Sequence, residues 1–157
     1  MITFHVDKLS ENLPFLSELL KDHYQELALN KEFVPLDPQY EVYLQREKQG
    51  ELIFITCREL GKIVGYYIGF VSPALHYQTC LTCITDIFYI SKQLRGSSVG
   101  LRLFRFVEKV LIGRGVQRWF MGSKLHADAS SLFERIGAEP VEIYYSKWIG
   151  ENSNEKQ

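Results

Sequence analysis

The sequence lacks the features that bring a protein to nucleic acid or into a membrane. Eighteen basic residues face 19 acidic ones, a net charge of −1, so no general basic field favours nucleic-acid binding. The longest apolar stretch, residues 63–71, is about half of what a membrane span needs. The first residues have neither the basic start nor the apolar run of a secretory signal. We therefore expect a cytoplasmic protein with no membrane partner and little affinity for nucleic acid.

Cysteine is also scarce. Three cysteines, an odd number without a disulfide framework, suit a reducing compartment. Cys80 and Cys83 form a Cys-x-x-Cys pair with His76 four residues earlier, but a structural zinc needs four ligands and the remaining thiol, Cys57, is distant. Residues three apart in a strand face opposite sides, so we interpret both thiols as strand side chains and expect no metal.

What the chain does have is the composition of one ordinary folded domain. Of its 157 residues, 46% are hydrophobic and 24% charged, and nothing in the sequence resembles a repeat or a linker. We expect a single domain over residues 1–149. The polar residues 150–157 are predicted to form a disordered tail.

The spacing of apolar residues predicts the order β-α-α-β-β-β-α-β-α-β, an α/β (α+β) fold. Helices are predicted where apolar residues recur at a 3.6-residue period, over 10–29, 39–49, 97–112 and 128–136. Strands are predicted over 2–6, 51–59, 62–72, 80–90, 116–121 and 141–149. Leu60-Gly61 marks a tight hairpin between the second and third strands.

A loop of small residues follows the strand predicted over 80–90 and opens the next helix. Backbone N–H groups and the positive end of a helix dipole would meet there, which favours a phosphate ligand. The small side chains that would let a pyrophosphate approach the backbone are those of Gly96, Ser97, Ser98 and Gly100. The loop matches neither a Walker loop nor a dinucleotide fingerprint. An ordinary capped helix is the alternative interpretation.

Two motifs resemble those of the GNAT acetyltransferase family. Arg95-Gly96-Ser97-Ser98-Val99-Gly100 is similar to the family's acetyl-CoA signature Gln/Arg-x-x-Gly-x-Gly/Ala, with Ser98 in place of the usual Gly. Ser131-Leu132-Phe133-Glu134-Arg135-Ile136-Gly137-Ala138 resembles its Leu-Tyr-Glu-Lys-Leu-Gly-Phe segment. The chain is also similar to small GNAT proteins of tailed phages and prophages. This resemblance implies the GNAT fold, with a mixed, mostly antiparallel sheet of six to seven strands flanked by about four helices.

The resemblance further implies an N-acetyltransferase in which an amine attacks the thioester of acetyl-CoA directly. The pyrophosphate would lie on the loop from Arg95 to Gly100, Val99 included. The family's oxyanion donor is a backbone N–H that corresponds to the stretch of Phe88, Tyr89 and Ile90. Phe133 stands where the family often has the Tyr that protonates the leaving thiolate, so it is expected to touch the cofactor without donating a proton.

Two residues are candidates for proton transfer. Asp86 stands where the family often places an acid, and a two-residue period puts it on one strand face with the apolar Ile84, Phe88 and Ile90. A carboxylate buried there would have a raised pKa, as suits a general base. A structural Asp bonded to a nearby loop is the alternative. His126 is a candidate general acid or cofactor contact, or else a surface residue at a strand end.

Other functions stay open at this stage. Ser98 and Phe133 favour a weak or inactive GNAT protein that binds CoA as a structural or regulatory ligand, whereas Asp86 favours an enzyme. A nucleic-acid-interacting or virion-associated protein is a third class, which the near-neutral charge disfavours. The family resemblance places the acceptor side at residues 30–43 and leaves a homodimer open. The acceptor is an amine of a class that the sequence does not identify.

Overall fold

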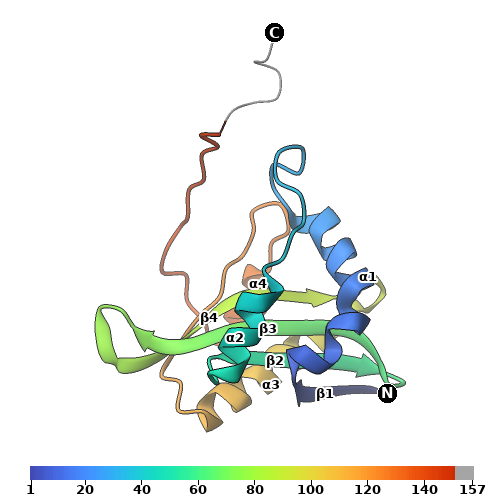
Figure 1. Cartoon of the computed structure of the whole chain (residues 1–157). Coiled ribbons are helices and arrows are strands. Elements are labelled where there is room, and N and C mark those ends of the chain that lie inside the picture. The colour runs from blue at the N-terminus through green and yellow to red at the C-terminus, as the bar shows by residue number, and fades with distance from the viewer. Residues whose placement is uncertain (151–157) are drawn as a thin grey trace.

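The computed structural model describes residues 1–150, so all but the first residue of the predicted tail lies outside the described part. Five strands and four α-helices follow one another along the chain (Figure 1). In order they are β1 (Ile2–Asp7), α1 (Leu9–Leu27), α2 (Tyr40–Lys48), β2 (Leu52–Glu59), β3 (Lys62–Ala74), β4 (Tyr77–Ile90), α3 (Val99–Gly113), β5 (Arg118–Phe120) and α4 (Ser130–Arg135). A short 3₁₀ turn over Lys92–Leu94 precedes α3.

The strands form one sheet in the order β1-β2-β3-β4-β5. The first three pairings are antiparallel and β4–β5 is parallel, so the prediction of a mixed, mostly antiparallel sheet with four helices is confirmed. The hairpin between β2 and β3 turns at Leu60 and Gly61, which both have positive φ, 48° and 82°. The predicted strand count was too high, because the sheet has five strands.

Each face of the sheet carries its own apolar core, because side chains alternate between the faces along every strand. On one face, Ile53, Ile55 and Tyr67 pack against Leu103 and Phe104 of α3 and Phe133 of α4, and together they make the α3-side core. On the other face, Phe54, Tyr66 and Ile68 pack against Leu9 and Leu16 of α1, and together they make the α1-side core. Each fully buried Leu or Phe contributes about 1.5–3 kcal/mol of transfer free energy.

A β-bulge interrupts β4 at Asp86. Thr85 pairs with Gly69 and Ile87 pairs with Ile68, so Asp86 is an extra residue that has no partner on β3. The side chain of Asp86 consequently lies on the α1 side, together with that of Ile87, whereas Phe88 packs on the α3 side.

The bulge overturns two expectations for Asp86. A strict two-residue period predicted that Asp86 lies on the same strand face as Phe88 and Ile90, and that its side chain is buried. Both predictions were wrong. Phe88 and Ile90 belong to the α3-side core, whereas Asp86 lines a cavity on the α1 side and is solvent-exposed. The extra residue shifts the alternation by one position, and this shift leaves no trace in the composition of the strand.

The strand predicted over residues 141–149 is absent from the structure. This segment, which we call the C-terminal arm, leaves the body of the protein and forms no ladder within the described residues (Figure 1). Its apolar side chains are exposed, with Ile143 at 74% and Tyr145 at 92%. The ring of Trp148 stacks on Phe33, with centroids 5.3 Å apart. β-propensity predicted a strand, but a strand also needs a neighbouring edge to bond with.

Within residues 1–150 no helix combines the length and the apolar character that crossing a membrane requires.

Candidate active site

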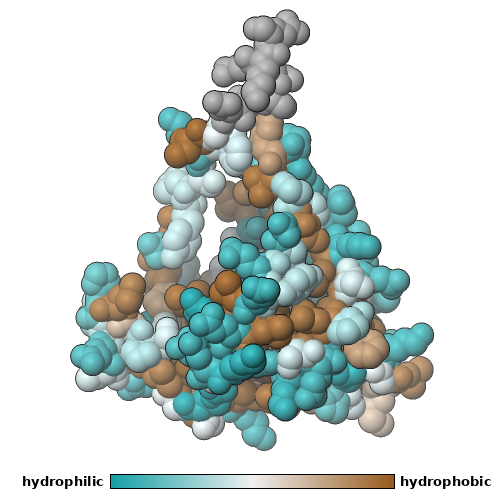
Figure 2. All heavy atoms as spheres, viewed as in Figure 1, coloured by the Kyte–Doolittle hydropathy of each residue, from teal (hydrophilic) through white to brown (hydrophobic). Residues whose placement is uncertain are grey.

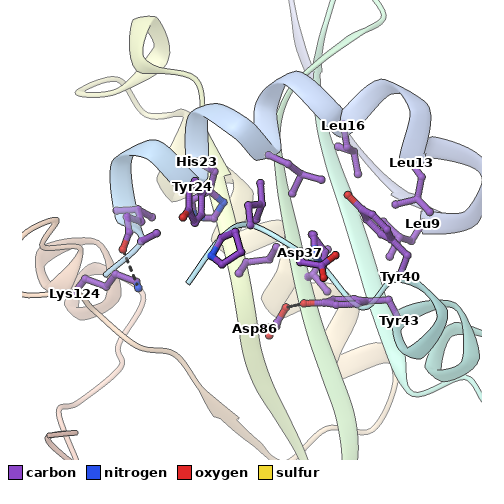
Figure 3. Close-up of a pocket in the computed structure, with 18 residues that line it drawn as sticks. Leu9, Leu13, Leu16, His23, Tyr24, Asp37, Tyr40, Tyr43, Asp86 and Lys124 are labelled. Carbon is purple, nitrogen blue, oxygen red and sulfur yellow. Dashed lines mark hydrogen bonds between the residues drawn. The ribbon is translucent and has the colours of Figure 1, made fainter. Parts of the chain in front are cut away.

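A cavity of about 370 Å³ lies between α1 and the sheet (Figure 3). Its walls come from α1, from the segment of residues 35–38, from α2, and from β3 and β4. We call it the α1 cavity. The segment of residues 35–38 falls within the region where the family resemblance placed the acceptor side. Figure 2 shows apolar surface between α1 and α2 in the same part of the molecule.

Asp86 and Tyr43 meet in the α1 cavity. The hydroxyl of Tyr43, on α2, donates a hydrogen bond of 2.6 Å to Oδ2 of Asp86 (Figure 3). Burial raises the pKa of Tyr43, and the hydrogen bond to Asp86 raises it further. The phenol of Tyr43 therefore stays protonated, and its hydrogen bond orients the Asp86 carboxylate. The carboxylate can still take a proton from a molecule in the cavity.

His23 lies in the same cavity and is almost fully buried, with 7% of its surface exposed. Its Nδ1 is 2.6 Å from the hydroxyl of Tyr66, and its ring stacks on Tyr89 at 5.2 Å. Burial lowers the pKa of His23 to about 4, and the positive charges of Lys124 and Arg95 act in the same direction. The imidazole is thus neutral at pH 7.

A second, smaller cavity opens where β4 and β5 separate. These strands pair only from Thr82 to Ile84 on β4. Beyond that point a hollow of about 210 Å³ lies between residues 85–88 and the segment of residues 122–129. We call it the β4–β5 cavity. Asp86 lines both cavities, as do His23, Leu27, Ile87 and Lys124, so the two hollows adjoin at these residues.

The predicted phosphate loop is exposed and lies at the start of α3. Gly96 has a φ of 76°, in the left-handed region that favours glycine, and Ser97 and Ser98 are exposed. The first N–H groups of a helix have no acceptor within it; here Val99 N–H reaches Oγ of Ser97 at 3.3 Å. A Cβ at Gly100 would meet only Leu132, 3.8 Å away, so the backbone is open on that side. The role of this loop as an anion site stays a prediction.

The side chain of Arg95 bonds to groups at the end of β4 and on α1. Its Nε donates to the carbonyl of Ile90 at 2.9 Å and its Nη2 to the carboxylate of Glu26, on α1, at 2.8 Å. Its guanidinium also lies 5.1 Å from the ring centroid of Tyr89. In this arrangement the side chain ties α1 to the end of β4, and the backbone N–H groups are left as the donors for an anion.

The remaining predicted site residues lie farther from the cavities. His126 occupies an exposed turn between Lys124 and Ala127 and lines neither cavity, so the structure does not bring it to Asp86. Phe133 is 7% exposed and packs in the α3-side core, 5.9 Å from Phe88 between ring centroids. Tyr89 is buried and Ile90 half-buried. Their proposed contacts with a cofactor stay predictions.

Sequence reasoning missed Tyr43 and His23. Tyr43 is 43 residues from Asp86, and His23 is 43 residues from Tyr66. Neither pair has a signature in sequence spacing, since the contacts depend on how α1 and α2 lie on the sheet. A signal for His23 was present: it is a titratable residue among the apolar positions of a helix face that the period assigns to the core.

No group of three or more His, Cys, Asp or Glu side chains in residues 1–150 could hold a metal ion. All three cysteines are free thiols, and Cys83 is buried in the α3-side core while Cys80 is half-buried.

Comparison with protein families identifies the class to which this site belongs. The model of the acetyltransferase (GNAT) family matches residues 15–138, most of the chain. The chain therefore belongs to the GNAT acetyltransferase family. The matched region contains residues 15–27 of α1, the loop before α3, and every residue that lines the β4–β5 cavity.

Solved structures with this fold are similar over nearly their whole length. A ribosomal-protein-alanine N-acetyltransferase from Brucella melitensis has a TM-score of 0.73 and 19% identity, with 94% of this chain and 98% of that chain covered. An aminoglycoside acetyltransferase from an uncultured soil sample has a TM-score of 0.74 and 14% identity, with 96% and 99% covered. A predicted acetyltransferase with acetyl-CoA from Clostridium acetobutylicum has a TM-score of 0.70 and 12% identity, with 94% and 96% covered. At these identities the likeness shows the fold alone. No curated protein sequence matches this chain significantly.

Proposed function

We propose that this protein is an N-acetyltransferase that moves an acetyl group from acetyl-CoA to a primary amine, with Asp86 as the general base. The observation that carries the proposal is the position of Asp86, which lines both the α1 cavity and the β4–β5 cavity. Membership of the GNAT acetyltransferase family supports the reaction class. A base at the junction of two hollows can reach an amine held in one and a thioester held in the other.

The residues before and within the first turn of α3 fit the pyrophosphate of acetyl-CoA. The open backbone at Gly96 and Gly100, and the exposed Ser97 and Ser98, leave N–H groups free to bind an anion. When bound, acetyl-CoA supplies an activated acetyl thioester. The β4–β5 cavity lies beside Phe88, where the family resemblance placed the backbone oxyanion donor.

The step in which a protein side chain is expected to help most is the removal of a proton from the amine. An alkyl amine has a pKa of about 10.4, so its neutral form is disfavoured by roughly 4–5 kcal/mol near pH 7. Asp86, oriented by the hydroxyl of Tyr43, takes that proton directly or through a water molecule. The nitrogen lone pair forms the new bond to the acetyl carbon, and the electrons of the carbon–sulfur bond leave with the CoA sulfur.

Departure of the thiolate does not require a protein acid. A thiol has a pKa of about 8.5, so its anion is a tolerable leaving group near neutral pH. This is consistent with a buried Phe at position 133, which has no proton to donate. His126 would have to move from its exposed turn to take that role.

A second candidate function is a GNAT protein that binds CoA without acetylating an acceptor. The observation that favours it is the solvent exposure of Asp86, which lacks the burial expected of a general base. Turnover of any amine by the purified protein would rule this function out.

Calorimetric titration of acetyl-CoA into the protein tests the first step. Two substitutions at one position make the result specific. Ser98→Asp places a carboxylate where the pyrophosphate would lie, and we expect the affinity to fall at least tenfold. Because an acid at the start of a helix is stabilising, this variant should fold at least as well as the parent. Ser98→Gly restores the family residue and should bind acetyl-CoA equally well or better.

No binding of acetyl-CoA to a folded sample would refute the proposed function. Equal binding by Ser98→Asp would refute the assignment of the phosphate loop while leaving the enzyme class intact.

A further inference from the structure

The α1 cavity has mainly apolar walls. Five leucines of α1 line it, and Pro35, Leu36 and Pro38 line it from the facing segment. Ile68 and Ile87 form its floor on the sheet. Its volume of about 370 Å³ lies within the range of small-molecule ligand sites.

The polar side chains of the cavity are mostly committed to partners in the protein. Tyr24 donates to the carbonyl of Val34 at 2.8 Å, and Lys124 donates to the carbonyl of Leu27 at 3.2 Å. The ring of His23 is bonded to the hydroxyl of Tyr66, as described above. These bonds use the Tyr24 hydroxyl, one of the three N–H donors of Lys124 and one ring nitrogen of His23, so fewer groups are left for a ligand.

Carboxylates stand out among the groups that remain available. Asp86 accepts one hydrogen bond, from Tyr43, and has a second oxygen. Asp37 also lines the cavity, and no partner of its side chain is found among residues 1–150. An ionised carboxylate only accepts hydrogen bonds, so both groups suit a cationic or amine donor and neither suits a hydroxyl oxygen that needs a donor.

We propose that the acceptor is a small primary amine carried on an apolar alkyl or aromatic body, with its nitrogen at Asp86 and its body among the leucines of α1. This inference rests on the proposed function and specifies its substrate class. The two carboxylates could accept hydrogen bonds from one or two hydroxyls, but a sugar or another polyhydroxylated acceptor would lose water from its remaining hydroxyls without gaining partners from the apolar walls. An unmet polar group costs about 1–3 kcal/mol when buried. An apolar body gains about 25 cal/mol for each Å² that it removes from water.

A panel of amines tests the substrate class. Phenethylamine and hexylamine represent the apolar class; glucosamine, kanamycin and a tripeptide with N-terminal alanine represent amines on polar bodies. Acetyl transfer is followed by release of the CoA thiol. We expect kcat/KM for the apolar amines to exceed that of the polar ones at least tenfold. An equal or higher value for any polar amine overturns the inference and leaves the proposed function standing.

Neighbouring leucines of α1 provide a matched pair of variants. Leu20 and Leu19 are both half-buried, but only Leu20 lines the cavity. For phenethylamine, Leu20→Gln should raise KM about tenfold, whereas Leu19→Gln should leave it within twofold. Leu36→Gln, on the exposed segment that also lines the cavity, gives a variant whose folding is not at risk and should raise KM in the same direction. Equal effects of Leu20→Gln and Leu19→Gln would overturn the placement of the amine body.

Direct binding separates this inference from the proposed function. Phenethylamine is titrated calorimetrically into the protein without acetyl-CoA, and glucosamine serves as the comparison. If no amine is acetylated but phenethylamine binds and Leu20→Gln abolishes that binding, the proposed function fails and the cavity assignment stands. If phenethylamine neither binds nor is acetylated while the protein does bind acetyl-CoA, the cavity assignment fails.

Discussion

The two faces of the sheet differ in what fills the space beneath their helices. On the α3 side, the ring of Phe104 is fully buried, with the rings of Phe88 and Trp119 at 4.9 and 5.6 Å. On the α1 side, the space between helix and sheet includes a cavity of about 370 Å³. The same strands supply both faces. The comparison indicates that the α3 side provides most of the rigidity and that the α1 side provides the place for a ligand.

We expect the two faces to differ most in how much unfolding free energy is lost when a core side chain is truncated. Phe104→Ala should lower the free energy of unfolding by about 3–5 kcal/mol, since it leaves a void in a close-packed core. Leu20→Ala, on the wall of the α1 cavity, should lower it by less than about 2 kcal/mol, because that side chain is already half-exposed. Urea-induced unfolding measures both. Equal losses would mean that the two faces contribute alike to stability.

We expect His23, on the α1 side, to make the free energy of unfolding fall at acid pH. His23 has a pKa of about 4 in the folded protein, lowered by burial, against about 6.5 when unfolded. Between those values the unfolded chain binds the proton and the folded one does not, so stability falls as the pH drops from 6.5 to 4. The loss should approach about 3 kcal/mol. We expect His23→Gln, which keeps a hydrogen-bonding side chain, to flatten this pH dependence measured by urea unfolding.

A variant on the other face makes the result specific. Cys83→Ala changes the α3-side core and should shift the whole stability curve without changing its slope between pH 4 and 6.5. If His23→Gln leaves the pH dependence of stability between pH 4 and 6.5 unchanged, His23 is not the cause of that dependence.

Removal of the proton from the amine should depend on residues of the α1 side. Asp86→Asn removes the proposed base and should lower kcat at least 10²-fold, about 2.7 kcal/mol, with the affinity for acetyl-CoA within twofold. Tyr43→Phe should have a smaller effect, up to about tenfold, because it removes only the hydrogen bond that orients the carboxylate. Steady-state rates on an accepted amine measure both. Unchanged kcat in Asp86→Asn would remove Asp86 as the base.

The smallest effect is expected at the edge between the two regions. Glu26 of α1 pairs with Arg95 before α3, and both side chains are partly exposed. Glu26→Gln should lower the free energy of unfolding by less than about 1 kcal/mol, as for other surface ion pairs. It should also release Arg95 and strengthen acetyl-CoA binding at low salt. A weaker affinity in this variant, measured by calorimetry, would indicate that the pair organises the loop.

Much of the fold could be predicted from periodicity, and the reasons for the failures are local. The period of 3.6 residues located α1 and α3, and a continuous apolar run located β4 as a central strand. Small residues before an amphipathic helix located the exposed loop at the start of α3, and its binding of a phosphate stays a prediction. The C-terminal arm has the composition of a strand, but pairing depends on an available edge, which composition does not encode.

The site was harder to predict than the fold. Asp86 was selected as a polar residue in an apolar strand and does line the α1 cavity, but its orientation depends on a bulge that a constant two-residue period cannot represent. Tyr43 became its partner only because α2 lies beside that bulge. Contacts between residues far apart in the chain follow from tertiary structure, so a single sequence carries no direct signal for them.

The bulge also bears on how such a site can arise. On both sides of Asp86, β4 keeps its regular alternation, with Thr85 and Phe88 toward α3 and Ile87 toward α1. Deleting the codon for Asp86 would restore a continuous alternation from Leu81 to Ile90, and inserting it adds one carboxylate on the α1 side. In genetic terms, the insertion of one codon is enough to add a carboxylate to a regular strand.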